Sequence, residues 1–184
     1  MAGKRTKIGR AKILSSKEVF KGRVFGVRSE RVQEPGGIIA TREIITHHGS
    51  IVVLPVFPDG SLLLIRQYRH AAASFLWELV AGHLEPGESK PRGAHRELIE
   101  ETGYTARKMR LLLEIFPSPG FVTERMWIFL ATGLTKGVAR PEDDEQITSK
   151  RISLAAAEKM IQDGTVRDAK SVAGILFYSR FVKK

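Results

Sequence analysis

Apolar residues fill residues 51–57, a run the length of one strand that contains Pro55. An apolar run of this length between turn signals predicts a strand buried on both faces, here residues 50–57. Pro58, Asp59 and Gly60 follow as a tight turn. Residues 61–68 then predict the neighbouring strand of the same sheet.

Other segments rich in Val, Ile, Phe and Thr predict further strands. They are residues 20–33, 38–47, 76–80, 109–116, 126–132 and 150–152. Pro35, Gly36 and Gly37 separate the first two of these segments. Because such residues mark turns, we expect the two segments to form an antiparallel hairpin at the N-terminal end.

Three segments carry helix signals. Ser89 can cap a helix that ends at Gly103, and Ser153 can cap one that ends near Gly164. A last helix begins at Asp168 or Ser171 and repeats apolar residues at helical spacing. Strands and helices in this order predict an α/β fold, in which a mixed sheet has helices packed on its faces.

The length and composition of the chain exclude several classes of protein, among them proteins with a membrane-spanning helix and disulfide-bonded proteins. The 184 residues suit one soluble domain with a proper core. No apolar run approaches the roughly 20 residues that cross a bilayer, and the first residues lack the apolar core of a secretion signal. The chain has no cysteine, which excludes disulfides and thiolate metal sites. We therefore expect a cytoplasmic protein without a membrane segment.

Positive charge is concentrated at the N-terminal end. The formal net charge is +10, and five of these charges come from Lys4, Arg5, Lys7, Arg10 and Lys12, which leaves 10 − 5 = +5 for the rest. Such a tail can bind nucleic acid through phosphate contacts, or it can simply be solvated and disordered. We expect the solvated tail, at residues 1–17, and an anionic substrate for the remainder.

The most informative segment is residues 82–104, with the sequence GHLEPGESKPRGAHRELIEETGY. On the expected helix, Glu97 lies three residues before Glu100 and four before Glu101, so the three carboxylates share one side. Clustered carboxylates repel one another unless a cation lies among them. Their oxygens suit Mg²⁺ or Mn²⁺, ions that commonly bridge carboxylates to substrate phosphates. An acidic helix face that is merely solvated is the alternative.

This segment resembles the Nudix box, G-x5-E-x7-R-E-U-x-E-E-x-G-U, in which U is a bulky aliphatic residue. The matching residues are Gly82, Glu88, Arg96, Glu97, Leu98, Glu100, Glu101 and Gly103. Tyr104 departs from the pattern at a packing position. The resemblance implies a Nudix-type α/β/α sandwich at residues 49–184, preceded by a small antiparallel β subdomain at residues 18–48.

The chain is also similar to the ADP-ribose pyrophosphatase branch of this family outside the box. The shared features are Arg66-Gln67-Tyr68-Arg69, the approach from Glu78 to Gly82, Ser118-Pro119-Gly120-Phe121 and Arg167-Asp168-Ala169-Lys170. Pro119 lies sixteen residues after Gly103, where a proline is typical of the branch.

The resemblance implies roles for the residues of the box. Glu97 and Glu101 would be the main metal ligands, assisted by Glu100 and by the carbonyl oxygen of Ala81, with two or three Mg²⁺ or Mn²⁺ ions. Gly82 would allow the backbone to approach an ion closely. Arg96 would pair with Glu88 and anchor the loop to the helix, a structural role, and Gly103 would end that helix.

Residues outside the box would complete the site. The general base would come from the acidic loop 142–145, with Glu145 our choice, unless that loop is merely solvated. Arg66 would grip the diphosphate, because a planar guanidinium suits phosphate oxygens. Arg42 and Phe25 would hold the adenine, often from the partner subunit of a homodimer, and Glu124 would contact the terminal ribose. For Arg66, Phe25 and Glu124, ordinary structural or exposed roles remain alternatives.

These expectations predict metal-dependent hydrolysis of a nucleoside diphosphosugar, first of all ADP-ribose, to AMP and ribose 5-phosphate. GDP-mannose or another nucleotide sugar is the nearest alternative. Hydrolysis of RNA 5′ ends would use the basic tail, but the Pro119 region argues against it. A nucleotide-sensing module with an inactive box is the alternative from another class, and every box carboxylate is present.

Overall fold

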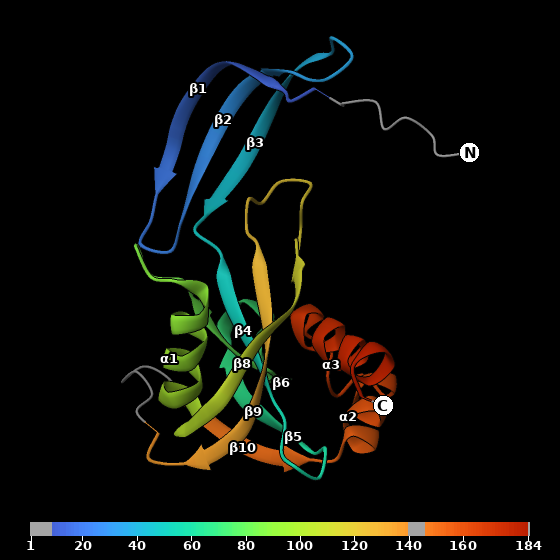
Figure 1. Cartoon of the computed structure of the whole chain (residues 1–184). Coiled ribbons are helices and arrows are strands. Elements are labelled where there is room, and N and C mark those ends of the chain that lie inside the picture. The colour runs from blue at the N-terminus through green and yellow to red at the C-terminus, as the bar shows by residue number, and fades with distance from the viewer. Residues whose placement is uncertain (1–8, 140–145, 184) are drawn as a thin grey trace, which may run out of the picture. The chain divides into compact units, whose positions relative to one another are not determined.

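The computed structural model describes residues 9–139 and 146–183 of the chain. It begins with a three-stranded antiparallel sheet in the order β1-β2-β3, built from β1 (Lys12–Lys21), β2 (Phe25–Gln33) and β3 (Ile39–His47) (Figure 1). Gly36 and Gly37 connect the last two strands with φ angles of 97° and 91°. Residues with a side chain rarely adopt such positive φ angles, so this connection requires glycine.

The first strand differs from the sequence prediction, which placed residues 12–17 in a tail and residue 20 at the start of a hairpin. In the structure β1 pairs with β2 from Lys12 opposite Gln33 to Lys21 opposite Gly26. All ten of its residues are exposed. Strand β1 is therefore formed by backbone hydrogen bonds to β2 and not by the burial of apolar side chains. For this reason the hydrophobic pattern of the sequence does not predict it.

The chain divides into two compact units. The first joins the residues up to His48 with the later segment Ser118–Glu124. That segment hydrogen-bonds to β3, because Ile45 donates to the carbonyl oxygen of Phe121 at 2.8 Å and Thr123 donates to that of Ile45 at 2.9 Å. The sequence did not predict this pairing between distant segments.

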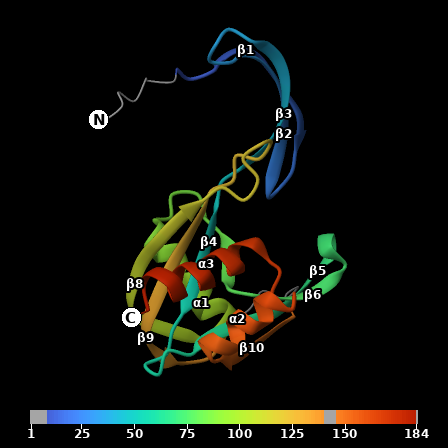
Figure 2. The same cartoon turned by 90° about the vertical axis from the view of Figure 1, so that its right-hand side faces the viewer.

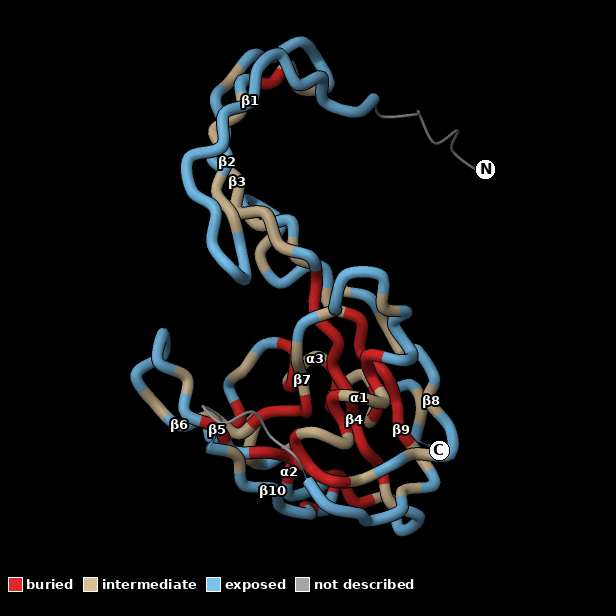
Figure 3. The backbone as a smooth tube through the Cα atoms, turned by 90° about the vertical axis from the view of Figure 1, so that its left-hand side faces the viewer, coloured by how far each residue is buried: buried red, intermediate tan, exposed pale blue. Residues whose placement is uncertain are grey.

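The second unit contains a mixed four-stranded sheet in the order β7-β4-β9-β8. Its strands are β4 (Ser50–Pro55), β7 (Val80–His83), β8 (Tyr104–Ile115) and β9 (Met126–Lys136). Strand β4 runs parallel to β9 and antiparallel to β7. Every residue of β4 is buried, as expected for a central strand covered on both faces (Figure 3).

A second sheet of this unit has the order β10-β5-β6. It is built from β5 (Leu62–Arg69), β6 (Ser74–Glu78) and β10 (Ile147–Ile152), and the short helix η1 (His70–Ala72) joins β5 to β6. All pairs in this sheet are antiparallel.

Helices lie on both sides of the β4 sheet, with α1 (Lys90–Thr102) on one side and α2 (Leu154–Gln162) and α3 (Ala169–Phe181) on the other (Figures 1 and 2). Because successive residues of a strand point to opposite faces, Ile51 and Val53 pack with the α1 side. Val52 and Leu54 pack with the α2 and α3 side. The predicted α/β class with a preceding antiparallel sheet is confirmed.

No helix of the described residues is long and apolar enough to span a membrane.

Helix α3 is held against the sheet by its first turn. Its N-cap residue Asp168 accepts hydrogen bonds from the backbone N–H and the hydroxyl of Ser171, at 3.0 and 2.5 Å. The same hydroxyl oxygen accepts the backbone N–H of Leu79 at 2.7 Å, and Ser171 is fully buried. One turn later, a Cβ on Gly174 would lie 2.8 Å from a methyl carbon of Leu79. The absence of a side chain at Gly174 thus allows the helix to approach the β6–β7 junction closely.

We expect Ser171→Ala to destabilise the protein by about 1–3 kcal/mol, because the buried N–H of Leu79 would lose its acceptor and the cap would lose a bond. Urea denaturation would measure the change as a lower midpoint at unchanged slope. Ser149→Ala on the exposed face of β10 is the matched control, with a change within about 0.5 kcal/mol. Equal stability of the two variants would contradict this role of Ser171.

Candidate active site

Helix α1 carries the carboxylates of the box. It begins after Ser89 and ends at Gly103, which has a φ angle of 72° and closes the helix with a bond from its N–H to the carbonyl oxygen of Ile99. Glu97 and Glu101 are buried, with residue exposures of 7% and 5%. The sequence predicted the shared helix side but not its burial. Strand β7 packs against α1, so this polar side lies within the protein.

The guanidinium of Arg96 organises the carboxylates of the box. It binds both oxygens of Glu88 at 3.0 Å, Oε1 of Glu97 at 2.7 Å and Oε2 of Glu100 at 3.0 Å. It also donates to the carbonyl oxygen of His83 at 2.9 Å. The hydrogen bonds that Arg96 donates to Glu88 raise the pKa of Arg96 despite partial burial, and the same bonds lower the pKa of Glu88. Arg96 therefore ties the loop and β7 to the helix.

Strand β7 approaches these carboxylates at Ala81 and Gly82. A Cβ on Gly82 would lie 2.1–2.2 Å from the carboxylate atoms of Glu97, which is too close for any side chain. The N–H of Ala81 donates to Oε2 of Glu101 at 3.3 Å. Glycine at position 82 is therefore required by the position of Glu97.

These groups fit the divalent ion that the box implies. The carboxylates of Glu97 and Glu101, together with the carbonyl oxygen of Ala81, are the hard oxygen donors that would hold it. Because Gly82 has no side chain, the carboxylate of Glu97 can lie directly against the backbone of β7. Within residues 9–139 and 146–183, no three acidic or histidine side chains are grouped so that they could hold a metal ion, and Glu100 pairs with Arg96. Glu145, the predicted base, lies outside the described residues.

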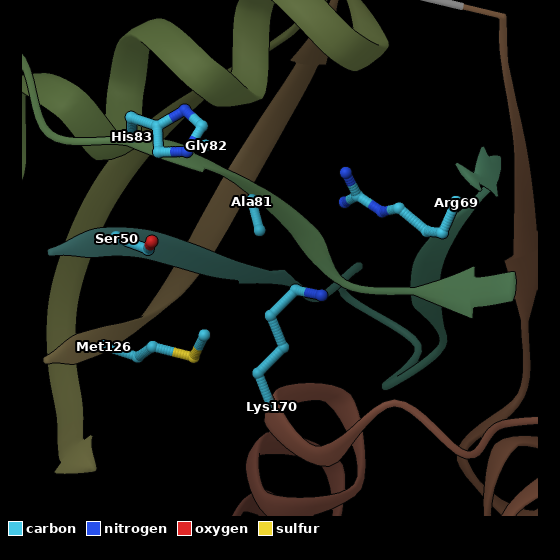
Figure 4. Close-up of a pocket in the computed structure, with 7 residues that line it drawn as sticks. All are labelled: Ser50, Arg69, Ala81, Gly82, His83, Met126 and Lys170. Carbon is cyan, nitrogen blue, oxygen red and sulfur yellow. The ribbon is translucent and has the colours of Figure 1, made fainter. Parts of the chain in front are cut away.

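A cavity of about 140 Å³ lies beside β7. Its lining residues are Ser50, Arg69, Ala81, Gly82, His83, Met126 and Lys170 (Figure 4). In the close-up, Arg69 from β5 and Lys170 from α3 both extend toward the strand that carries Ala81. Two cationic side chains therefore lie beside the backbone of the box, an arrangement suited to an anionic ligand.

Arg66, the predicted diphosphate ligand, does not line this cavity. It stacks on Phe75, with its guanidinium carbon 4.5 Å from the ring centroid. Arg66 and Arg69 are three residues apart on β5, so the pleat directs them to opposite faces of the sheet. The structure therefore brings Arg69 rather than Arg66 to the cavity.

Arg42, Phe25 and Glu124 all belong to the first unit of the chain. Arg42 pairs with Glu34 at 2.7 Å, and Phe25 packs against Phe20 with ring centroids 5.6 Å apart. Oε1 of Glu124 lies 3.8 Å from Nδ1 of His47. Their proposed roles toward a substrate remain predictions.

The sequence analysis missed a buried charge cluster at the cavity. Glu78 is 1% exposed and accepts bonds from Nε and Nη2 of Arg69 at 2.9 and 2.8 Å and from Lys170 at 2.5 Å. Burial by itself would raise the pKa of Glu78, but Arg69 and Lys170 outweigh it and hold the pKa below its ordinary value. In turn, the bonds with Glu78 raise the pKa of Arg69.

The sequence contains one trace of this cluster, the position of Lys170 on a helix face, but it does not identify the partner. Glu78 interrupts an apolar strand, and Lys170 lies four residues before Gly174 and eight before Tyr178. This is the spacing of one helix face, and all three positions of α3 are buried. A lysine on a buried helix face indicates a buried partner.

Comparisons with known proteins agree with this geometry. Residues 46–173 match the family described as NUDIX domain. An ADP-ribose pyrophosphatase of Bacillus subtilis (strain 168) is 34% identical over 168 residues, which cover 90% of this chain and 91% of that protein. An ADP-ribose pyrophosphatase of Mycobacterium tuberculosis is 35% identical over 167 residues, with coverage of 89% and 80%.

A solved structure described as an ADP compounds hydrolase superposes with a TM-score of 0.82 at 25% identity, and the match covers 96% of each chain. The likeness therefore extends over both units, and the fold and family predicted from the box are confirmed. The chain belongs to the Nudix hydrolase family.

Proposed function

We propose that this protein hydrolyses the diphosphate bond of a nucleoside diphosphosugar, with ADP-ribose the preferred substrate, in a reaction that depends on Mg²⁺ or Mn²⁺. The observation that carries the proposal is the placement of two buried carboxylates against strand β7, Glu97 beside Gly82 and Glu101 at the N–H of Ala81, next to a cavity lined by Arg69. The relatives named ADP-ribose pyrophosphatase support this choice of substrate.

In the proposed reaction, water adds to one phosphorus atom and the bond to the bridging oxygen breaks, which yields AMP and ribose 5-phosphate. Bound divalent ions would supply charge neutralisation and lower the pKa of a bound water. Glu97 and Glu101 would hold them, and Arg96 keeps Glu97 in place at 2.7 Å. Glu145 remains our proposal for the base, and Arg69 replaces Arg66 as the proposed diphosphate ligand because Arg69 lines the cavity.

A substrate panel tests this function. ADP-ribose, GDP-mannose and an RNA with a 5′-triphosphate would be incubated with Mg²⁺, Mn²⁺ or EDTA, and the nucleoside monophosphate or phosphate released would be measured. We expect metal-dependent release of AMP from ADP-ribose, with the highest kcat/KM of the panel. Glu101→Gln should lose at least ~100-fold in kcat, the order found when transition-state stabilisation is removed.

Near-normal turnover by Glu101→Gln would contradict a mechanism centred on the box. Faster hydrolysis of GDP-mannose or of the RNA would reassign the substrate. The absence of any metal-dependent hydrolysis by the folded wild-type protein would instead favour a nucleotide-sensing module.

Gly82 provides a test of carboxylate position without any change of charge. We expect Gly82→Ala to lower kcat by roughly 10- to 1,000-fold, because the new Cβ displaces the Glu97 carboxylate from β7. The unfolding free energy should change little, since the displaced atoms are the end of a flexible side chain. Gly9→Ala is the control, as a Cβ there meets nothing within 4 Å. Unchanged kcat in Gly82→Ala would show that the position of Glu97 is unimportant.

We further propose that the protein is a homodimer formed through its N-terminal sheet. A small sheet of three strands needs a packed apolar face to be stable in water, yet β1 is exposed along its whole length. Several large apolar residues of the sheet and its turns are also exposed, namely Ile13, Val19, Phe20, Phe25, Ile38 and Ile39. A second copy would cover them and pair an open edge.

The dimer proposal predicts complementation between two inactive variants. If Arg42 serves the neighbouring subunit's site, then mixing Arg42→Ala chains with Glu101→Gln chains should regenerate one intact site in each heterodimer. Activity after subunit exchange, compared with each variant alone, measures this. Scattering that shows a monomer, or confirmed exchange without recovered activity, would contradict the arrangement.

A further inference from the structure

The cavity beside β7 contains two cations that share one buried carboxylate. Arg69 binds Glu78 with two hydrogen bonds, and Nζ of Lys170 lies 2.5 Å from the same carboxylate and 3.0 Å from Asp168. The side chain of Lys170 is 9% exposed, and that of Glu78 is 1% exposed. Burial of charged groups is costly even when they are paired. A site that keeps a buried lysine beside a cavity therefore suggests a function beyond stability.

The position of Lys170 follows from the packing of α3. Gly174 allows this helix to lie close to Leu79, and Lys170 lies one turn earlier on the same buried face. Ser171, beside it, binds the N–H of Leu79. These contacts place the Lys170 ammonium against Glu78, the residue that precedes Leu79. Its location is thus determined by backbone packing rather than by a flexible surface side chain.

The bonds to Glu78 and Asp168 use only part of the N–H donors of the two cationic side chains that line the cavity. Arg69 uses one N–H of Nε and one of Nη2 for Glu78, out of the five N–H donors of a guanidinium. Lys170 has three N–H donors and directs two of them to Glu78 and Asp168. In the close-up, both side chains extend toward the backbone at Ala81 (Figure 4). One carboxylate therefore holds a guanidinium and an ammonium at one cavity.

The size of the cavity limits what the pair can bind. Its volume of about 140 Å³ is below the roughly 300 Å³ at which pockets for whole small molecules begin. Arg69 and Lys170 both offer charged N–H donors, and a phosphoryl group supplies acceptor oxygens for both. The combination of size and charge therefore fits one phosphoryl group better than a nucleoside.

We propose that Lys170 is a substrate-binding residue that acts with Arg69 to hold one phosphoryl group of the substrate, anchored through Glu78. This inference rests on the proposed function, since that function supplies a diphosphate as the ligand. It also assigns a direct binding role to α3, an element outside the box. The directly ion-paired groups, Arg69 and Lys170 with Glu78 and Asp168, sum to 2 − 2 = 0, and loss of Lys170 changes this sum to 1 − 2 = −1. A negative cluster would repel the phosphoryl group.

The test uses inorganic pyrophosphate as the probe, in EDTA, with binding measured by calorimetry. We expect Lys170→Met to weaken binding roughly 10- to 100-fold, as expected for the loss of a charged hydrogen bond. Lys159→Met on the exposed side of α2 is the matched control and removes the same charge. Its affinity should equal that of the wild type. In steady-state kinetics, Lys170→Met should raise KM for ADP-ribose more than it lowers kcat.

Lys170→Arg is the second variant, because it keeps the charge beside Glu78 and is expected to fold even if Lys170→Met does not. It should bind pyrophosphate more weakly than the wild type, since the two side chains present their donors differently. Wild-type affinity in the folded Lys170 variants would overturn the proposal, as would a wild-type protein that binds no pyrophosphate. If the wild type binds pyrophosphate through Lys170 but hydrolyses no nucleoside diphosphosugar, the anion site stands and the proposed function fails.

Discussion

The pairing of the buried Glu78 carboxylate with two cations is the interaction on which the arrangement of the second unit depends. An unpaired charge at this depth would be strongly destabilising, by about 3–5 kcal/mol when one partner of a buried pair is removed. Glu78 is not left unpaired, because it forms ion pairs with Arg69 from β5 and Lys170 from α3. Because Glu78 itself ends β6, one side chain connects three elements that are far apart in sequence. The strand that follows, β7, is thereby held between the cavity and the box helix.

The box uses the opposite arrangement of charges. There one cation, Arg96, is shared by the carboxylates of Glu88, Glu97 and Glu100. The guanidinium offers five donors in a planar fork, so a single side chain can satisfy several acceptors. Both clusters adjoin the backbone at Ala81 and Gly82, one rich in carboxylates and one with cationic side chains that line a cavity. The proposed reaction, with its metal ions and diphosphate, would use these two kinds of surface next to each other.

Close backbone contacts at two glycines make this proximity possible. At Gly82 the missing side chain leaves room for the Glu97 carboxylate, and at Gly174 it lets α3 approach Leu79. Neither glycine has a positive φ angle, so the requirement is space rather than backbone conformation. From the box pattern, Gly82 was expected to let an ion approach the backbone, whereas in the structure the carboxylate of Glu97 occupies that position. The same residue serves both purposes if the carboxylate holds the ion.

The sequence by itself determined the α/β class, the helix from Ser89 to Gly103 and the family, because these depend on local spacing of apolar residues, caps and box residues. It also indicated that Arg96 meets Glu88, since the two occupy fixed positions of the box. Tertiary structure decided which arginine of β5 lines the cavity, because the pleat directs Arg66 and Arg69 to opposite faces and only packing determines which face holds the site. It likewise decided that Lys170 joins Glu78, 92 residues away along the chain. A contact of that separation depends on how α3 docks, and local periodicity contains no information about it.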